Sequence, residues 1–268
     1  MLRSLSPRRR LLVLTLALAL AAGTAAGLVL ALRPEAGPPM IADAVVPVLV
    51  VHGYDGTPAE FDRLAALLAA SGRPVVRVAL PAQGTGDIAA SARALAAAVD
   101  RAGAARVDLV GYSAGGIVVR AFLGLPGRAQ RARRVVLVGA PNHGAEIAGL
   151  AASLDPRLCT GACAQLVPSS AFLARLNQEG TPPGPEVTSI WTARDKTVTP
   201  PTSAVLEGAH NVRVQDVCAS SGVGHGGLVT DPLVLGLAVR ALEGDLAQRL
   251  GPADCSDLQA LGAGPTTG

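Results

Sequence analysis

The chain has 268 residues, of which 50% are hydrophobic and 2% aromatic, enough for one domain with a core of Ala, Val and Leu. Its formal net charge is +3, but residues 1–33 hold five arginines and no acidic residue, which leaves 18 basic and 20 acidic residues in the remainder. The basic character belongs to the N-terminal segment, and no basic stripe with interleaved aromatics is present, which argues against a nucleic-acid partner.

The N-terminal segment is typical of export. Residues 1–10 are rich in arginine, and residues 11–32 form an apolar run of 22 residues without charge. Two interpretations stay open: a cleaved signal peptide, favoured by the small residues Ala21–Ala26, or membrane anchoring by residues 11–32, favoured by a length above the roughly 20 residues that span a bilayer. Arginines before the run place everything after it outside the cytoplasm.

The folded part is expected over residues 41–258. Residues 34–40 are rich in proline and glycine, which stop helices, and predict a linker. Residues 259–268 are predicted to be a flexible tail, because the sequence from about Gly251 is again rich in Gly, Pro and Thr.

Six apolar runs predict strands. They are rich in valine and continuous rather than alternating, which is typical of strands buried on both faces of a parallel sheet. The predicted strands are Val46–Val51, Val75–Leu80, Val107–Val110, Val135–Gly139, Val187–Thr192 and Val212–Val217.

Helical patterns alternate with these runs. Thr57 is a candidate N-cap for a helix over Pro58–Ser71, which Gly72 would end. Further helices are predicted at about 86–102, 113–124, 168–178 and 230–249. Strands alternating with helices predict an α/β fold, with a mostly parallel sheet of about six strands flanked by helices.

The strongest motif is Gly111-Tyr112-Ser113-Ala114-Gly115, which lies between a predicted strand and a predicted helix. This pattern at such a junction forms a nucleophile elbow, in which a strained turn exposes the serine hydroxyl. A chance match is the alternative in a chain with 31 glycines, but the flanking strand and helix argue against it. Ser113 is the predicted nucleophile.

Over residues 46–235 the chain resembles the α/β-hydrolase superfamily, and within it the small secreted bacterial lipases and esterases. The segments that carry the resemblance are VPVLVVHGYDGTPAEF, GYSAGG, VGAPNHGA and the surroundings of Asp195 and His225. It implies an α/β-hydrolase fold and a triacylglycerol lipase-like activity.

A serine nucleophile needs a base. In the superfamily the order along the chain is serine, acid, histidine. Of the four histidines, only His210 and His225 follow a candidate acid, and His225 is preferred because it lies in a glycine-rich loop after the last predicted strand. His210 precedes that strand.

Asp195 is the predicted acid, because it follows the strand Val187–Thr192 and would orient the histidine. An ion pair with Arg194 or Lys196, the only lysine, is the alternative role. Asp216 lies inside a predicted strand, and Asp231 is interpreted as the N-cap of the last helix.

The oxyanion hole is expected to consist of two main-chain N–H groups. One belongs to Ala114, after the nucleophile, and the resemblance implies Tyr54 for the other. His52 is expected to form hydrogen bonds within its own loop, and His143 to have a structural role or to line the pocket.

The four cysteines predict two disulfides, because they lie in a segment expected in an oxidising compartment. Three pairings are possible. The short spacing favours Cys159 with Cys163, which leaves Cys218 with Cys255. A metal site is disfavoured because no histidine has ligand spacing, and no cofactor is expected.

The predicted function is a serine carboxylic ester hydrolase, lipase-like, that acts on a small-molecule or lipid ester through an acyl-enzyme on Ser113. The segment between Pro141 and Val187 is expected to hold one helix and a minimal cap. The alternatives are an acyltransferase for extracellular lipids, a non-catalytic binding protein with the same fold, and a peptidase. A monomer is expected.

Overall fold

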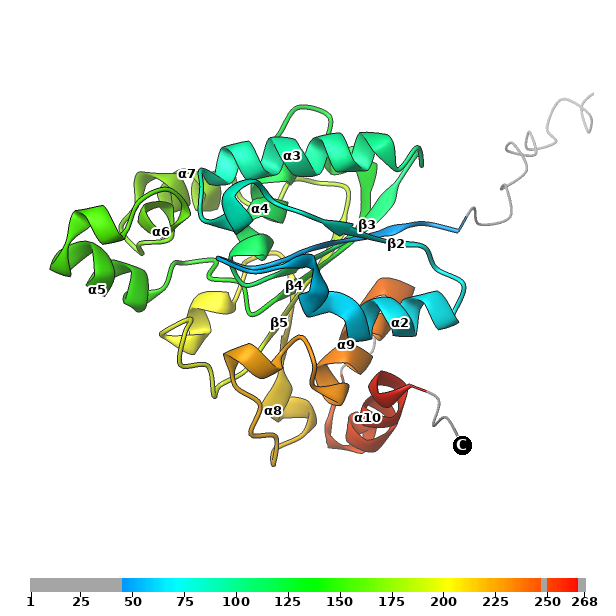
Figure 1. Cartoon of the computed structure of the whole chain (residues 1–268). Coiled ribbons are helices and arrows are strands. Elements are labelled where there is room, and N and C mark those ends of the chain that lie inside the picture. The colour runs from blue at the N-terminus through cyan, green and yellow to red at the C-terminus, as the bar shows by residue number, and fades with distance from the viewer. Residues whose placement is uncertain (1–44, 247–249, 265–268) are drawn as a thin grey trace, which may run out of the picture. The chain divides into compact units, whose positions relative to one another are not determined.

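A six-stranded parallel sheet, with strand order β2-β1-β3-β4-β5-β6, organises the chain (Figure 1). The computed structural model describes residues 45–246 and 250–264. The predicted signal or anchor and the linker, residues 1–40, lie outside them. The strands are β1 (Val48–Val51), β2 (Val75–Val78), β3 (Val107–Tyr112), β4 (Ala132–Val138), β5 (Glu186–Trp191) and β6 (His210–Arg213).

Helices cover both faces of this sheet, as Figure 1 shows. The helices of the described residues are α2 (Asp62–Ala70), α3 (Ile88–Arg101), α4 (Ala114–Leu123), α5 (Glu146–Leu154), α6 (Ala162–Gln165), α7 (Ala171–Glu179), α8 (Val214–Val217), α9 (Pro232–Glu243) and α10 (Cys255–Ala263). Among the described residues, no helix is long and apolar enough to cross a membrane.

The valine-rich strands are continuous because both faces are buried. In β1, Leu49 and Val51 belong to the core beneath α3 and α4, whereas Val48 and Val50 belong to the core beneath α2 and α9. All four side chains are fully buried. The predicted fold class is confirmed.

The predicted last strand, Val212–Val217, is wrong in its second half. Strand β6 spans His210–Arg213, and Val214–Val217 form the helical turn α8. Val214 and Val217 are both buried, and residues three apart share a face in a helix but not in a strand. As β6 pairs only with β5, it forms an edge of the sheet.

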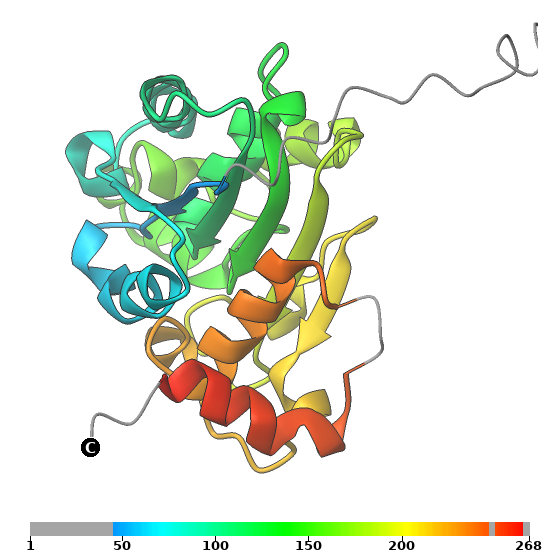
Figure 2. The same cartoon turned by 90° about the vertical axis from the view of Figure 1, so that its right-hand side faces the viewer.

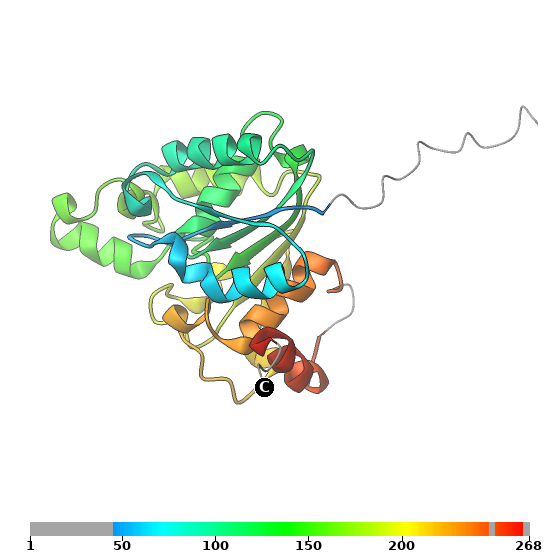
Figure 3. The ribbon, with the colours of Figure 1, turned by 45° about the vertical axis from the view of Figure 1, so that its right-hand side comes forward.

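The segment between Pro141 and Val187 holds three helices, α5, α6 and α7, instead of the single helix expected. Figure 3 shows α5 and α6 beyond the carboxyl ends of the central strands. Three side chains of α5, Ile147, Leu150 and Leu154, are more than half exposed. This helix lacks the buried apolar face that sequence reasoning looks for.

The flexible tail predicted for residues 259–268 is wrong up to Ala263, where α10 ends; residues 265–268 are outside the described part. Figure 2 shows α10 lying across α9. A Cβ atom on Gly262 would lie 1.8 Å from the carbonyl oxygen of Pro232, and one on Gly236 would lie 2.0 Å from that of Leu258. Glycine therefore serves helix packing here, not chain flexibility.

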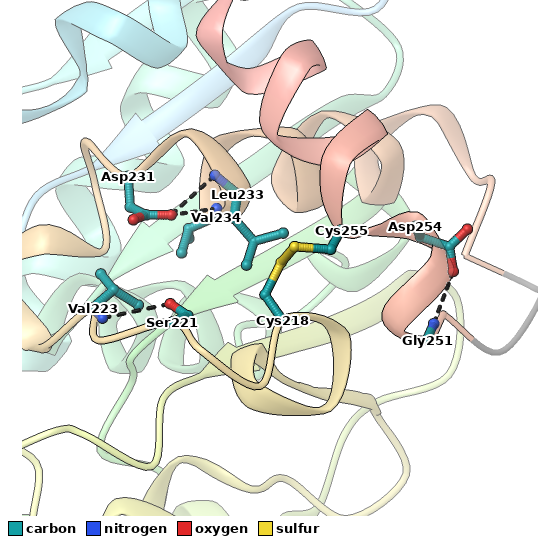
Figure 4. Close-up of a disulfide and its surroundings, with 9 residues drawn as sticks. All are labelled: Cys218, Ser221, Val223, Asp231, Leu233, Val234, Gly251, Asp254 and Cys255. Atoms are coloured by element: carbon teal, nitrogen blue, oxygen red, sulfur yellow. Dashed lines mark hydrogen bonds between the residues drawn. A yellow bond between two sulfur atoms is a disulfide. The ribbon is translucent and has the colours of Figure 1, made fainter.

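Both predicted disulfides are present. Cys159 and Cys163 close a short loop between α5 and α6, and Cys218, after α8, is joined to Cys255, the first residue of α10. Figure 4 shows the second bridge beside the start of α9, where Asp231 accepts hydrogen bonds from the N–H groups of Leu233 and Val234. Asp231 is the N-cap of α9, as predicted.

Candidate active site

Ser113 lies in a strained turn between β3 and α4. Its φ is +52° and its ψ −128°, a conformation rare for a residue with a side chain. The serine N–H donates to the carbonyl of Val138, 2.9 Å away. A Cβ atom on Gly115 would lie 2.3 Å from the carbonyl oxygen of Val51, and one on Gly111 would lie 2.7 Å from that of Gly115. Both glycines are therefore required for the close approach of β1, β3 and α4.

Three residues far apart in sequence meet at this turn. The Nε2 atom of His225 lies 3.0 Å from the hydroxyl oxygen of Ser113, and its Nδ1 atom lies 2.7 Å from the Oδ2 atom of Asp195. Asp195 follows β5, and His225 lies in the loop after α8. The side chains of Asp195 and His225 are 3% and 10% exposed, so both are shielded from water.

The orientation of Asp195 is set by main-chain groups. Its Oδ1 atom accepts hydrogen bonds from the N–H groups of Thr197 and Val198, at 2.9 and 2.8 Å. This leaves the Oδ2 atom for His225. Within residues 45–246 and 250–264 Asp195 has no ion pair with Arg194 or Lys196. The structure therefore gives Asp195 the histidine as its partner, not the adjacent cations.

Tyr112 positions His225. Its hydroxyl donates to the main-chain carbonyl of His225 at 3.0 Å, and the two rings lie 5.1 Å apart between centroids. Burial, together with the carboxylates of Glu60 and Asp195, raises the pKa of Tyr112 well above its usual value, so the hydroxyl remains a donor. Sequence reasoning missed Tyr112, because the motif leaves this position unspecified.

Tyr54 and Ala114, the two residues expected to form the oxyanion hole, both line the cavity at Ser113. Within the part of the chain that the structure describes, their main-chain N–H groups have no hydrogen-bond partner. Ala114 is the first residue of α4, where N–H groups lack an intrahelical acceptor. The pair is available to a developing oxyanion.

The loop that carries Tyr54 is held by Glu60 and His52. The Glu60 carboxylate accepts hydrogen bonds from the N–H groups of Thr57, at 3.2 Å, and Gly53, at 3.5 Å. His52 accepts from the N–H of Leu80 through Nε2, so its Nδ1 carries the proton and donates to the Gly53 carbonyl. His52 has the expected structural role. Sequence reasoning missed Glu60, although glutamate three residues after a threonine N-cap was a usable signal.

The other two histidines lie away from Ser113. His210 begins β6. Because the strands are parallel, it lies at their amino ends, whereas Ser113 lies at their carboxyl ends. His143 contacts Asn177 and, with Arg120, lines a different cavity. It does not line the cavity at Ser113, which leaves the structural role for it.

The cavity at Ser113 has a volume of about 350 Å³ and is mostly apolar. It lies between the nucleophile turn and the segment that carries α5 and α6. Among the described residues, no charged side chain lines it and no group of side chains is suited to a metal ion. Its apolar wall includes Pro141, Ala145, Ala148, Ala151, Leu166 and Val198.

The family model described as "Alpha/beta hydrolase family" matches residues 48–259, more than half of the chain. Among solved structures, the fold is similar to Aspergillus fumigatus lipase B, with a TM-score of 0.67, 22% identity and coverage of 85% of this chain and 59% of that one. It is also similar to an esterase from a Rhodococcus species, with a TM-score of 0.53, 21% identity and coverage of 76% and 92%. This chain thus spans less than two thirds of the fungal lipase, and these identities show the fold alone. Comparison with curated protein sequences gives no significant match.

Proposed function

Because the chain belongs to the alpha/beta hydrolase family, we propose that it is a serine hydrolase of carboxylic esters whose catalytic residues are Ser113, His225 and Asp195. The observation that carries the proposal is the continuous hydrogen-bonded chain from the Ser113 hydroxyl through both ring nitrogens of His225 to Asp195. This chain of contacts allows the imidazole to accept the serine proton while the carboxylate orients the ring.

The reaction proceeds in two steps. The Ser113 oxygen attacks the ester carbonyl, and His225 takes the hydroxyl proton. The carbonyl oxygen becomes negatively charged and accepts hydrogen bonds from the N–H groups of Tyr54 and Ala114. The bond to the alcohol then breaks, and His225 returns the proton to the leaving oxygen. Water, deprotonated by the same histidine, attacks the acyl-enzyme, releases the carboxylic acid and restores Ser113.

The apolar cavity at Ser113 favours an ester with an apolar acyl group. It shares Ser113, Ala114 and Tyr54 with the oxyanion site, so an acyl chain attached to the reacting carbonyl extends into it. Because none of the charged side chains in the described part of the chain lines this cavity, a charged acyl group would lose hydration without compensation. Two similar structures are named a lipase and an esterase, and these names agree with the proposed substrate class.

The proposed place of action is outside the cytoplasm, secreted or anchored at the outer face of the membrane. Both disulfides support it, because disulfides persist in oxidising compartments.

Turnover of p-nitrophenyl esters of graded acyl length tests the proposal. The wild type is expected to hydrolyse at least one of them, and Ser113→Ala to reduce kcat by about 10⁴-fold or more. Ser256→Ala, at an exposed position on α10, is the matched control and is expected to retain activity. A wild type inactive on every ester, or a Ser113→Ala variant as active as the wild type, overturns the proposal.

A further inference from the structure

A second cavity lies beside the catalytic histidine. Its volume is about 510 Å³, and His225 is part of its wall. Thr197 lines both this cavity and the apolar one at Ser113, so the two cavities adjoin at that residue. We call the second one the His225 cavity.

The His225 cavity differs from the apolar cavity in charge. Arg194 and Lys196 line it, and none of the acidic side chains that the structure describes does. Both side chains are exposed, and within the described residues neither forms an ion pair. The one carboxylate between them in sequence, Asp195, is occupied by His225 and two main-chain N–H groups. Two positive charges beside the reaction centre therefore have no counter-charge from the described residues.

The rest of the His225 cavity wall is mainly glycine. Four glycines of the loop around His225 line the cavity and have no side chain to narrow it: Gly222, Gly224, Gly226 and Gly227. The cavity is thus wide enough for a substituted alcohol, and the cations are accessible from it.

The chemistry of the reaction assigns the two halves of an ester to the two cavities. His225 must give its proton to the leaving oxygen, so the alcohol part has to lie on the side of the histidine. The carbonyl oxygen lies toward Tyr54 and Ala114, and the acyl chain continues into the apolar cavity that these residues line. The His225 cavity is then the place for the alcohol.

From this geometry we propose that the natural ester carries a negatively charged group, a phosphate or a carboxylate, on its alcohol part, and that Arg194 and Lys196 bind it. The proposal rests on the proposed ester hydrolysis. It makes the substrate amphipathic, with an apolar acyl chain and an anionic alcohol. Arginine and lysine are both suited to such oxyanions, arginine through paired hydrogen bonds and lysine as a point charge.

The experiment compares butyryl esters that differ in charge on the alcohol: those of 4-hydroxybenzoate, of its neutral methyl ester and of 4-hydroxyphenyl phosphate. For each enzyme, the measured quantity is the ratio of kcat/KM for an anionic ester to kcat/KM for the neutral one. In Arg194→Gln/Lys196→Gln this ratio is expected to fall about 3- to 10-fold from its wild-type value, mainly through KM for the anionic ester. The anionic ester whose ratio falls more in the double variant identifies the anion.

Arg101→Gln is the matched control. It removes an exposed arginine at the end of α3, at the amino ends of the strands and away from Ser113, and is expected to leave the ratio unchanged. Added salt is expected to reduce the ratio for the wild type, because it screens exposed charges.

A ratio in the double variant equal to that of the wild type overturns the proposal. Failure of the proposed function gives a different result from failure of this proposal, because no ester in the set would then be hydrolysed in a manner that depends on Ser113.

Discussion

The Oδ2 atom of Asp195 lies 2.7 Å from the Nδ1 atom of His225, and two main-chain N–H groups bind the other carboxylate oxygen. Asn in place of Asp195 keeps the shape but removes the charge and can leave the imidazole in the wrong tautomer. Asp195→Asn is therefore expected to lower kcat for a p-nitrophenyl ester by about 10³- to 10⁴-fold. Asp216→Asn is the matched control, because Asp216 is exposed and bound to Arg213. Equal losses in the two variants would contradict the assignment of Asp195 as the acid.

The hydrogen bond from Tyr112 to the carbonyl of His225 is expected to contribute about 1 kcal/mol to the free energy of unfolding at pH 8, measured as the difference between wild type and Tyr112→Phe. Burial raises the pKa of Tyr112 from its usual 10.0, so the folded chain holds this proton more tightly than the unfolded chain does.

The sign of the pH effect follows. The contribution of Tyr112 is fully present below pH 10 and declines as the pH rises further, so the difference between wild type and Tyr112→Phe should shrink from pH 10 upward. Urea unfolding at pH 8, 10 and 11 measures it. A difference that stays constant or grows over this range would refute the assignment.

Ala148 lines the apolar cavity and is 8% exposed. A phenylalanine at this position would occupy part of the 350 Å³ that is proposed to hold the acyl chain. Ala148→Phe is expected to move the preferred acyl length of p-nitrophenyl esters toward shorter chains, with a larger loss of kcat/KM for long chains than for acetate. Ala253→Phe, at an exposed position before α10, is the control. An unchanged length profile would show that the acyl chain lies elsewhere.

The disulfide between Cys218 and Cys255 closes a loop with a sequence separation of 37. Cys218→Ala/Cys255→Ala is expected to lower the free energy of unfolding by about 2–4 kcal/mol, because the unfolded chain regains the entropy of that loop. Cys159→Ala/Cys163→Ala opens a loop with a separation of only 4, so its loss should be smaller. Denaturant unfolding compares the two, and an equal or greater loss in the second variant would argue against the loop-entropy account.

The central strands and the helices behind them could be predicted from sequence, because burial on both faces of the sheet produces continuous valine-rich runs. The run Val48–Val51 and the glycines around Ser113 are dictated by contacts that any sequence with this fold must satisfy. Order along the chain left both His210 and His225 as candidate bases, and the choice of His225 followed from its place in a glycine-rich loop after the last predicted strand. The structure brings His225 to Ser113.

The remaining features depend on contacts between distant segments. Tyr112 acts on a carbonyl 113 residues away, and nothing near it in the sequence indicates that partner. Helix α10 depends on Gly262, which packs against Pro232 but by composition alone predicts a tail. Helix α5 exposes Ile147, Leu150 and Leu154, so the usual rule that apolar side chains mark a buried face fails there.

Lys196 is the only lysine in the chain, and it lies in the wall of the His225 cavity. An amine-reactive reagent therefore modifies one lysine side chain only, beside the reaction centre, in addition to the α-amino group of the chain. An acyl group on the Lys196 nitrogen would remove a positive charge that is proposed to bind the alcohol part. Chemical acylation of the wild-type chain should thus reproduce part of the effect of the Lys196 substitution without any mutation.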